Sequence, residues 1–423
     1  MIIMEKIYDI SQLDLSRYIQ PGDHVIWGQA QSEPTPLTQN LMQHRNKIGK
    51  FSVFLGISQY ATCQTEYSDY IKFSSYCGTG YNRPLAKQHL LDILPVHYSQ
   101  FPTLIEQRLL PVDVVLIQVS EPNIQGQYSY SLGQDYLKSA IQHARIVIAE
   151  VNKQAPWTHS DHYLTEDNFD VLVYTDRKIE SPTESPLSEI SLSIARHAAS
   201  IIKNGSTLQL GIGSIPEAIL TVLGQHQDLG IHSGIISDGV MQLMKQGVIN
   251  NQKKSIDSGL TVAGLISGSA ELHQYVHKNL AIQLRPTEYT HHAKILCQLD
   301  NFIAINSAIE VDLTGQINTE IANHTYVGAV GGALDFIRAA NHSNGGLSII
   351  ALPSSGKNFS RIVSHLQGTV ATPRSDAAVI ITEYGIADLR GLTTSQRTQK
   401  MISIAAPDYR HLLEKQAQEL KLI

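Results

Sequence analysis

The sequence predicts an α/β protein made of two similar domains, each with a mostly parallel sheet covered by helices. Two observations support this fold class. Short apolar runs such as residues 114–119 (VVLIQV) and 145–151 (RIVIAEV) are continuous rather than alternating, as in strands buried on both faces. Helical segments separate these runs, and the whole pattern occurs twice along the chain.

The repeat is visible in the residues themselves. Residues 21–37 (PGDHVIWGQAQSEPTPL) echo residues 204–220 (NGSTLQLGIGSIPEAIL): each has a glycine turn, an alternating strand, a glycine and a proline-containing helix start. Residues 114–119, followed by SEPNIQGQYSYS, echo residues 302–306, followed by SAIEVDLTGQINTE. The offset stays between about 183 and 189 residues, which predicts two domains of similar topology.

The boundary between the halves is predicted at residues 179–189 (IESPTESPLSE), which carry two prolines, three serines and no apolar period. We therefore expect domains at residues 1–182 and 183–423. From residue 394 onward the chain is expected to form helices with a break at Pro407. Two related sheets favour a site between their facing carboxyl ends.

Composition narrows the function classes. The chain has 423 residues, 17% of them charged, and a net charge of -6, which gives no electrostatic case for a nucleic-acid partner or an anionic membrane. Three cysteines without a CxxC pair do not predict a disulfide framework. No apolar run approaches the length of a membrane span, and we expect a cytoplasmic protein without a membrane partner.

The stretch at residues 204–240 is the first candidate site. A strand at residues 207–210 leads into the bend Gly211-Ile212-Gly213, and a helix is expected to start near Pro216 and Glu217. Free backbone N–H groups at such a bend can bind an anion, although many α/β folds use a glycine bend only to turn tightly. A second strand and bend are expected at residues 231–239.

A second glycine loop, GAVGG at residues 328–332, precedes another predicted helix. Gly328, Gly331 and Gly332 leave backbone amides free to hold an oxyanion, and the alternative is close packing of helix on sheet. Two such loops at comparable places in related halves favour a shared site.

Two carboxylates and several histidines remain. Glu288 lies in LRPTEYTHH and Glu383 in VIITEYGIADLRG, the latter at the end of an apolar strand, where site residues of α/β proteins gather. The histidines have no zinc-site spacing, so no metal is predicted. Cys77 is expected to be a buried, inert thiol. The chain has no GxSxG, no Walker A motif and no complete GxGxxG.

Taken in order from about residue 20 to residue 415, a series of motifs resembles the acetyl-CoA hydrolase/transferase family, which contains acetate, succinate, butyrate and 4-hydroxybutyrate CoA-transferases. They are WGQAQSEP, LPVHYSQFP, VDVVLIQVSEPNIQGQYSYS, VIAEVN, LQLGIGSIPEAIL, SDGV, AINSAIEVDLTGQINTE, VGGALDFIRAA, IIALPS and TEYGIADLRGLTTSQR. The resemblance implies two similar α/β domains with the active site between them. It also implies coenzyme A, bound as acyl-CoA, a small carboxylate substrate and a homo-oligomer.

The family reaction implied is ping-pong CoA transfer. An active-site glutamate attacks the thioester to give a mixed anhydride, CoA then returns to leave a glutamyl-CoA thioester, and a carboxylate takes the CoA. By matching motifs, the backbone amides of Ile212 and Gly332 would form the oxyanion hole, and Glu383 would be a carboxylate near the nucleophile. The neighbouring glycines that would contact CoA are Gly211, Gly213, Gly328 and Gly331.

The sequence departs from the family pattern at two places. Where the family has His/Tyr-Thr/Ser-Glu, two residues and Ser/Gln-Asp-Gly, residues 232–239 read HSGIISDG, so Gly234 stands in place of the nucleophilic glutamate. Three residues beyond Glu288, where the family often has asparagine, this chain has His291. Glycine cannot form the anhydride, so ping-pong transfer through residue 234 is not available to this chain.

Three hypotheses follow. The first is a CoA-transferase in which Glu288 or Glu383 has taken over the covalent role. The second is an acyl-CoA hydrolase, decarboxylase or acyltransferase without a glutamyl-CoA intermediate, with His291 as acid or base. The third is a non-catalytic acyl-CoA-binding protein.

Overall fold

The computed structural model describes residues 4–182 and 186–423 and divides the chain into two compact units. Met1–Pro182 and Val262–Thr290 form one unit, and Thr183–Thr261 and His291–Ile423 form the other. Part of the predicted boundary at 179–189, residues 183–185, lies outside the described residues. Within the described ranges, no helix is both long and apolar enough to cross a bilayer.

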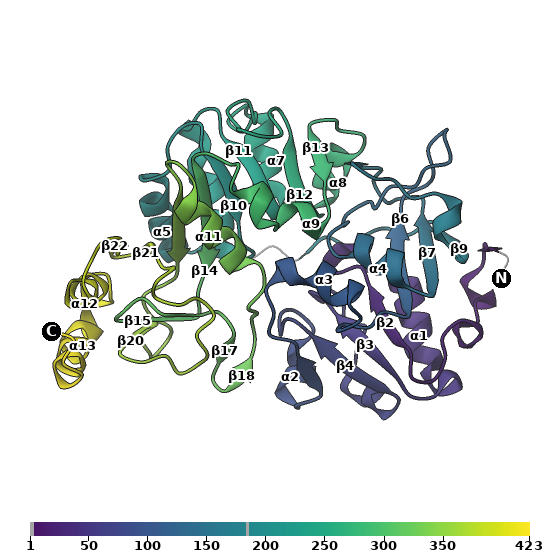
Figure 1. The fold of residues 1–423 in the computed structure, drawn as a ribbon, viewed down its shortest axis with the longest axis horizontal. Coiled ribbons are helices and arrows are strands. Elements are labelled where there is room, and N and C mark those ends of the chain that lie inside the picture. The colour runs from purple at the N-terminus through teal and green to yellow at the C-terminus, as the bar shows by residue number, and fades with distance from the viewer. Residues whose placement is uncertain (1–3, 183–185) are drawn as a thin grey trace. The chain divides into compact units, whose positions relative to one another are not determined.

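The first unit is built on an eight-stranded sheet with the order β1-β9-β7-β6-β2-β3-β4-β5, and its neighbouring strands are parallel throughout (Figure 1). The central strands are fully buried, as their continuous apolar sequences predict. The strands are β1 (Glu5–Ile7), β2 (His24–Trp27), β3 (Phe51–Leu55), β4 (Ile71–Ser75), β5 (Leu91–Ile93), β6 (Val114–Val119), β7 (Ile146–Asn152) and β9 (Val171–Thr175).

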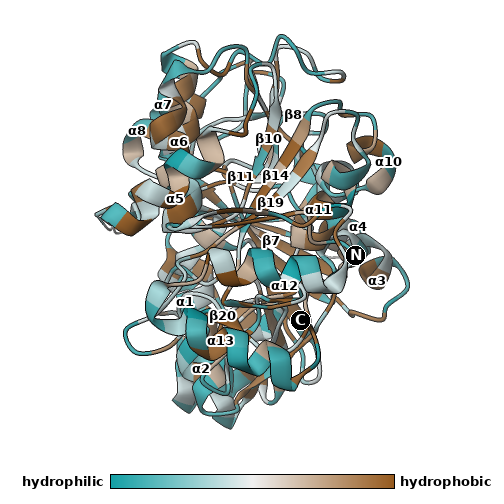
Figure 2. Cartoon of the chain, turned by 90° about the vertical axis from the view of Figure 1, so that its left-hand side faces the viewer, coloured by the Kyte–Doolittle hydropathy of each residue, from teal (hydrophilic) through white to brown (hydrophobic). Residues whose placement is uncertain are grey.

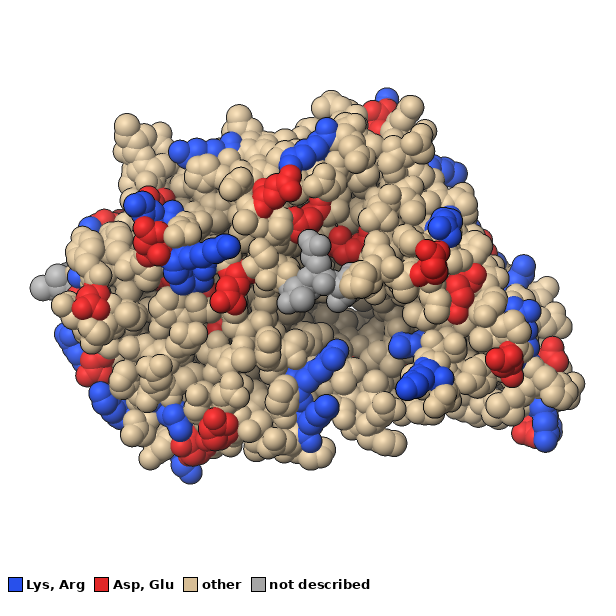
Figure 3. Space-filling view, turned by 180° about the vertical axis from the view of Figure 1, so that it is seen from behind, with Lys and Arg blue, Asp and Glu red and all other residues tan. Residues whose placement is uncertain are grey.

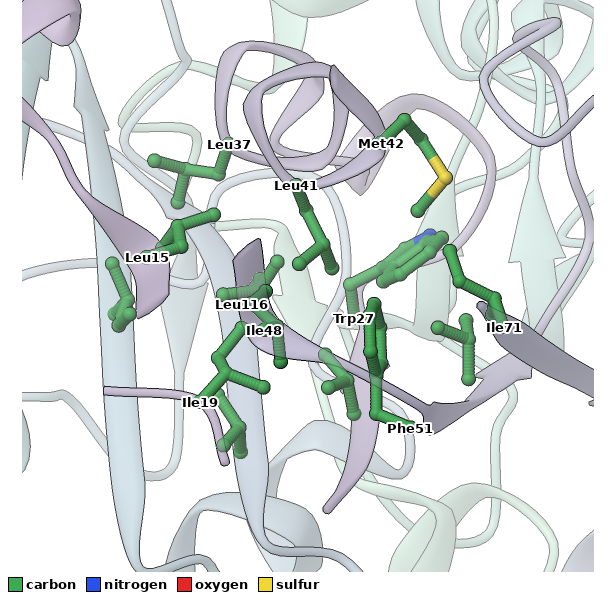
Figure 4. Packing of buried hydrophobic residues seen from close by; sticks show 14 of the residues in the cluster. Leu15, Ile19, Trp27, Leu37, Leu41, Met42, Ile48, Phe51, Ile71 and Leu116 are labelled. Atoms are coloured by element: carbon green, nitrogen blue, oxygen red, sulfur yellow. The ribbon is translucent and has the colours of Figure 1, made fainter. Parts of the chain in front are cut away.

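Helix α1 (Thr35–Ile48) starts at a proline-rich turn and ends at Gly49, whose φ of 90° is readily adopted only by glycine. It covers an apolar core in which Trp27 and Phe51 pack with Leu41 and Met42 (Figure 4). The other elements of this unit are α2 (Arg83–Lys87), α3 (Phe101–Glu106), α4 (Leu137–His143), β8 (His159–Ser160), β12 (Thr261–Ile266), α8 (Ala270–Val276), β13 (Ile282–Leu284) and α9 (Thr287–Thr290).

The second unit contains strands in the order β22-β21-β19-β14-β10-β11. All of these pairs are parallel except the edge pair β21–β22. The strands are β10 (Thr207–Leu210), β11 (Gly230–Ile236), β14 (Phe302–Ser307), β19 (Leu347–Ala351), β21 (Val379–Thr382) and β22 (Gly385–Asp388). Smaller sheets join β15 (Glu310–Asp312), β16 (Ile317–Asn318) and β20 (Ile362–Val363), and β17 (Ile321–Ala322) with β18 (Thr325–Tyr326).

The internal repeat predicted from the sequence is confirmed in the topology. The order β9-β7-β6-β2-β3 in the first unit has the same chain succession as β21-β19-β14-β10-β11 in the second. In both series the first strand of the repeat, β2 or β10, lies between the second strand, β3 or β11, and the third strand, β6 or β14. The predicted fold class, two similar α/β domains with mostly parallel sheets, is therefore correct.

Helices of the second unit follow the predicted pattern with shifted ends. Helix α6 starts at Ser214, so Pro216 lies in its first turn and not at its start. Strand β11 stops at Ile236, and Gly239 belongs to helix α7, which corrects the strand and bend expected at 231–239. The helices are α5 (Glu189–Ala199), α6 (Ser214–Val222), α7 (Asp238–Lys245), α10 (Ala293–Leu296), α11 (Ala333–His342), α12 (Thr394–Ser403) and α13 (Pro407–Glu419).

The break before Pro407 is confirmed, because α12 and α13 are separate helices. Figure 2 shows hydrophilic residues along both, whereas β19 is largely hydrophobic and buried. On the face drawn in Figure 3, acidic and basic side chains are interspersed, in line with the small net charge.

Candidate functional site

The first glycine loop joins the carboxyl end of β10 to the start of α6. The Gly211 amide is used within the sheet, donating to the Ile305 carbonyl at 2.8 Å. Gly213 has a φ of 128°, a conformation that side chains disfavour, and it caps α6 without a side-chain hydrogen bond. Ile212 between them is 60% exposed, so the loop projects its backbone into the open.

The Ile212 amide has no hydrogen-bond partner in the described part of the chain. It stands directly before the amino end of a nine-residue helix, where the partial positive charge of the helix dipole favours anions. This is the property that an oxyanion-hole donor needs. The structure therefore gives the sequence-predicted Ile212 a suitable local geometry.

The second glycine loop lies between β18 and α11. Gly328 passes so close to Thr319 that an added Cβ would lie 1.8 Å from its carbonyl oxygen. Gly331 adopts a left-handed φ of 56°, and Gly332 is the N-cap of α11. The Gly332 amide lies at the start of α11, where the helix dipole favours an anion, as it does at Ile212. The loop thus needs glycine for close approach and places a backbone amide at the amino end of a helix.

His291 lies against both glycine positions singled out from the sequence. A Cβ built on Gly234 would lie 3.2 Å from Cε1 and Nε2 of His291, and one built on Gly332 would lie 2.5 Å from Nε2. The ring also packs on Phe336, with centroids 4.6 Å apart and planes at 50°. The second unit therefore brings Gly234, His291 and Gly332 into one cluster.

Burial controls the charge of this imidazole. His291 is 6% exposed, and its burial lowers the pKa to about 3. The ring is consequently neutral at physiological pH, with one nitrogen able to donate and the other able to accept a hydrogen bond. A neutral ring can orient a polar group through a hydrogen bond, but with so low a pKa it is a weak base at physiological pH.

Glu383 lies just beyond the end of β21, in the tight connection to β22. Both of its carboxylate oxygens are held by Ser354: the Ser354 amide donates to Oε2 at 2.8 Å and the Ser354 hydroxyl donates to Oε1 at 2.7 Å. Ser354 follows β19, so Glu383 lies at the carboxyl edge of the sheet, as its sequence context predicted. Its oxygens are already engaged, which reduces their nucleophilicity.

Glu288 belongs to the first unit, on the single-turn helix α9. Burial raises the pKa of Glu288, and its Oε2 is buried without a hydrogen-bond partner among the described residues. Lys138 partly counters the shift, and Asp161 adds to it. The two predicted acids are thus unlike: Glu383 is held by two donors, and one oxygen of Glu288 has none.

Sequence reasoning missed three participants in this region. Phe336 supports the His291 ring, and Ser354 holds Glu383. Glu217 links the start of α6 to the start of α7 within residues 204–240. Burial raises the pKa of Glu217, and the neighbouring Ser237 side chain and Gly239 amide partly counter this shift. The i,i+4 spacing from Gly332 to Phe336 was an available signal, because it puts both on one helix face.

Other expected groups do not join the cluster. Cys77 is buried, as predicted, and burial raises the pKa of its thiol, which disfavours the reactive thiolate. Within the described part of the chain, no group of three or more His, Cys, Asp or Glu side chains is arranged to hold a metal ion.

Comparison with known proteins matches this chain to two halves of one family. Residues 5–182 match the model of the acetyl-CoA hydrolase/transferase N-terminal domain, and residues 268–417 match that of the acetyl-CoA hydrolase/transferase C-terminal domain. A 4-hydroxybutyrate coenzyme A transferase of Clostridium kluyveri is 36% identical over 403 residues, covering 93% of this chain and 94% of that protein.

Solved structures agree. RipA from Yersinia pestis superimposes with a TM-score of 0.92 at 30% identity, over 97% of this chain and 96% of RipA. A 4-hydroxybutyrate CoA-transferase from Porphyromonas gingivalis gives a TM-score of 0.83 at 32% identity, over 98% of each chain.

Proposed function

The chain belongs to the acetyl-CoA hydrolase/transferase family, and on that premise we propose that it acts on acyl-CoA thioesters and small carboxylates without a covalent intermediate at residue 234. It is an enzyme of that family. Membership of the family is the evidence for CoA esters as ligands. Similarity to 4-hydroxybutyrate CoA-transferases is the evidence for a carboxylate as the second ligand.

The observation that carries this proposal is the pairing of Gly234 with His291. In the matched motif, residue 234 is the position of the family glutamate, and here it has no side chain to attack a thioester. The imidazole of His291 lies within 3.2 Å of where a Cβ of residue 234 would be. A ring thus occupies space that a glutamate at residue 234 would enter.

The remaining groups suit attack by water on the thioester. In the proposed reaction, water bonds to the carbonyl carbon, and the carbonyl oxygen becomes an oxyanion held by the amides of Ile212 and Gly332. Collapse of this intermediate breaks the C–S bond, and the proton from water ends on the departing CoA sulfur. His291, neutral because of burial, orients the water through a ring nitrogen and does not store its proton.

The test is a panel of acyl-CoAs incubated with and without acetate. Free thiol is measured with a disulfide reagent, and new CoA esters are measured by mass spectrometry. Thiol release independent of acetate, lowered at least about tenfold in His291→Gln, is the expected result. A new CoA ester formed in place of free thiol contradicts hydrolysis, and unchanged turnover in His291→Gln contradicts the role of the ring.

A second candidate is CoA transfer through Glu288. It is favoured by one observation: the buried, partner-free Oε2 of Glu288 contrasts with the doubly held carboxylate of Glu383. A carboxylate oxygen without a donor is the stronger nucleophile. This candidate predicts covalent labelling of Glu288 by acyl-CoA.

A homo-oligomer is proposed on the family premise alone. Sedimentation of the full chain tests it, because a single species of 46.7 kDa would contradict it.

A further inference from the structure

Arg361 lies at the end of the connection from β19 to β20, residues 352–361. Its backbone is fixed on both sides: its amide donates to the Ser354 carbonyl at 2.8 Å, and its carbonyl accepts from the Val311 amide at 2.8 Å. Ser354 is the residue that holds Glu383. Arg361 is therefore anchored at the carboxyl edge of the sheet in the second unit.

The guanidinium of Arg361 is half-buried and lacks an anionic partner. Nη1 donates to the Ile309 carbonyl at 3.2 Å, and Nε is buried without a hydrogen-bond acceptor. No carboxylate lies within 4 Å of it in the described ranges, and its other contact is the Phe359 ring, 5.7 Å from Cζ to the centroid. The partly buried Arg177, by contrast, is paired with the buried Glu150 at 2.7 Å.

An arginine cannot escape this situation by losing its proton, although burial lowers the pKa of Arg361. Withdrawing a cation from water without a counter-charge is unfavourable, and leaving its N–H unbonded adds to that cost. An oxyanion would supply both the counter-charge and the acceptors that this guanidinium lacks.

We propose that Arg361 binds a carboxylate of the substrate, either the free carboxylic acid or a distal carboxylate of the acyl group. This rests on the proposed function for the identity of the ligand. With Nε buried and one N–H of Nη1 engaged, the second terminal nitrogen and the other N–H of Nη1 remain for a planar carboxylate, which a guanidinium binds through two parallel hydrogen bonds.

CoA phosphates are the other source of an oxyanion. CoA phosphates are strongly hydrated. The exposed Lys357 of the same connection therefore suits them better than the half-buried guanidinium of Arg361. The two sources are separable because carboxylic acids and CoA can be added to the protein one at a time.

The experiment is calorimetric titration of the full chain with succinate, acetate, CoA and 3′-dephospho-CoA. Arg361→Gln is expected to weaken carboxylate binding at least about tenfold and Arg361→Lys by about three- to tenfold, because an ammonium lacks the planar fork. Lys357→Gln, which removes the same charge from the same connection, is the matched control and should change carboxylate affinity less than about twofold. CoA affinity should stay within about twofold in both Arg361 variants.

Equal carboxylate affinity in wild type and Arg361→Gln overturns the inference, and so does a wild type that binds neither acid. Loss of CoA affinity in Arg361→Gln, together with loss of the preference for CoA over 3′-dephospho-CoA, assigns Arg361 to a phosphate instead. Circular dichroism and the melting temperature verify folding, and Arg361→Lys carries the test if the glutamine variant does not fold.

Binding is measured without a thioester, so this inference and the proposed function fail separately. Arg361-dependent carboxylate binding in a protein that cleaves no thioester leaves the inference standing. Thioester cleavage with Arg361-independent carboxylate binding overturns the inference and leaves the proposed function standing.

Discussion

Gly234 and His291 are spatial neighbours: a Cβ on Gly234 would lie 3.2 Å from the His291 Nε2 atom. Such a contact is tighter than packed side chains normally allow, so any larger residue at 234 requires the ring to shift. The glycine and the imidazole therefore constrain each other, and single substitutions at either position are expected to behave differently from the pair.

Gly234→Glu alone should destabilise the protein by about 1–3 kcal/mol through overpacking and give little CoA exchange. Gly234→Glu with His291→Asn removes the ring and should give measurable exchange of labelled acetate into acyl-CoA. The control is Gly234→Gln with His291→Asn, which has nearly the same volume but no carboxylate to form an anhydride. Equal exchange by the two double variants, or no exchange by a folded glutamate double variant that binds CoA, contradicts the assignment of position 234.

The pH dependence of stability should carry the signature of His291. Its pKa falls from 6.5 in the unfolded chain to about 3 in the folded protein, so between these values the unfolded chain binds a proton that the folded protein excludes. The contribution of His291 is fully present above pH 6.5 and is lost as the pH falls, with a slope of up to about 1.4 kcal/mol per pH unit.

Urea unfolding of wild type and His291→Gln at pH 4.5, 5.5, 6.5 and 7.5 measures this difference. The gap in unfolding free energy between the two proteins should narrow toward acid pH. His365→Gln, at an exposed histidine, is the matched control for loss of an imidazole. A gap independent of pH would show that the imidazole has the same pKa in the folded and unfolded protein, which contradicts its burial as a neutral ring.

Gly332→Ala tests the second glycine loop. The added methyl group would lie 2.5 Å from the His291 Nε2 atom, so the ring or the loop must move, at a cost of about 1–3 kcal/mol, with a large loss of thioester turnover. Gly224→Ala is the matched control, because its Cβ would meet its nearest neighbour at an ordinary 3.6 Å. Chemical denaturation and turnover are measured for both, and similar effects would remove the special status of Gly332.

Trapping experiments decide between the two candidate mechanisms. The protein is incubated with acyl-CoA, treated with hydroxylamine and digested, and the peptides containing Glu288 and Glu383 are weighed. Water as the nucleophile predicts no hydroxamate on either residue and turnover retained in Glu288→Gln. A hydroxamate on Glu288, lost in Glu288→Gln, establishes the transfer mechanism in place of hydrolysis.

The architecture was predictable because it rests on patterns that burial enforces locally. Continuous apolar runs predicted strands such as β6 and β7, and the repeat predicted the shared strand order. The glycine loops were recognisable because their bends exclude side chains, as the 1.8 Å approach at Gly328 illustrates.

The surroundings of the site were less accessible to sequence reasoning, because they depend on packing between distant segments. The residues next to His291 in the sequence do not predict that its ring packs on Phe336. The residues next to Glu383 do not predict that Ser354 donates a hydrogen bond to it. Glu288 and His291 are three residues apart, yet they fall in different compact units. Arg361 was overlooked because its significance is the absence of a partner, which a sequence does not display.

The division of the chain also has a consequence for synthesis. The first unit draws its last segment, Val262–Thr290, from beyond residues 183–261, which belong to the second. Its amino-terminal 182 residues therefore leave the ribosome without β12, β13 and α9 and must wait for about a hundred more residues before that unit is complete. During translation, part of the second unit is therefore synthesised before the first unit is complete. A fragment ending at residue 182 would be an incomplete domain with exposed apolar surface.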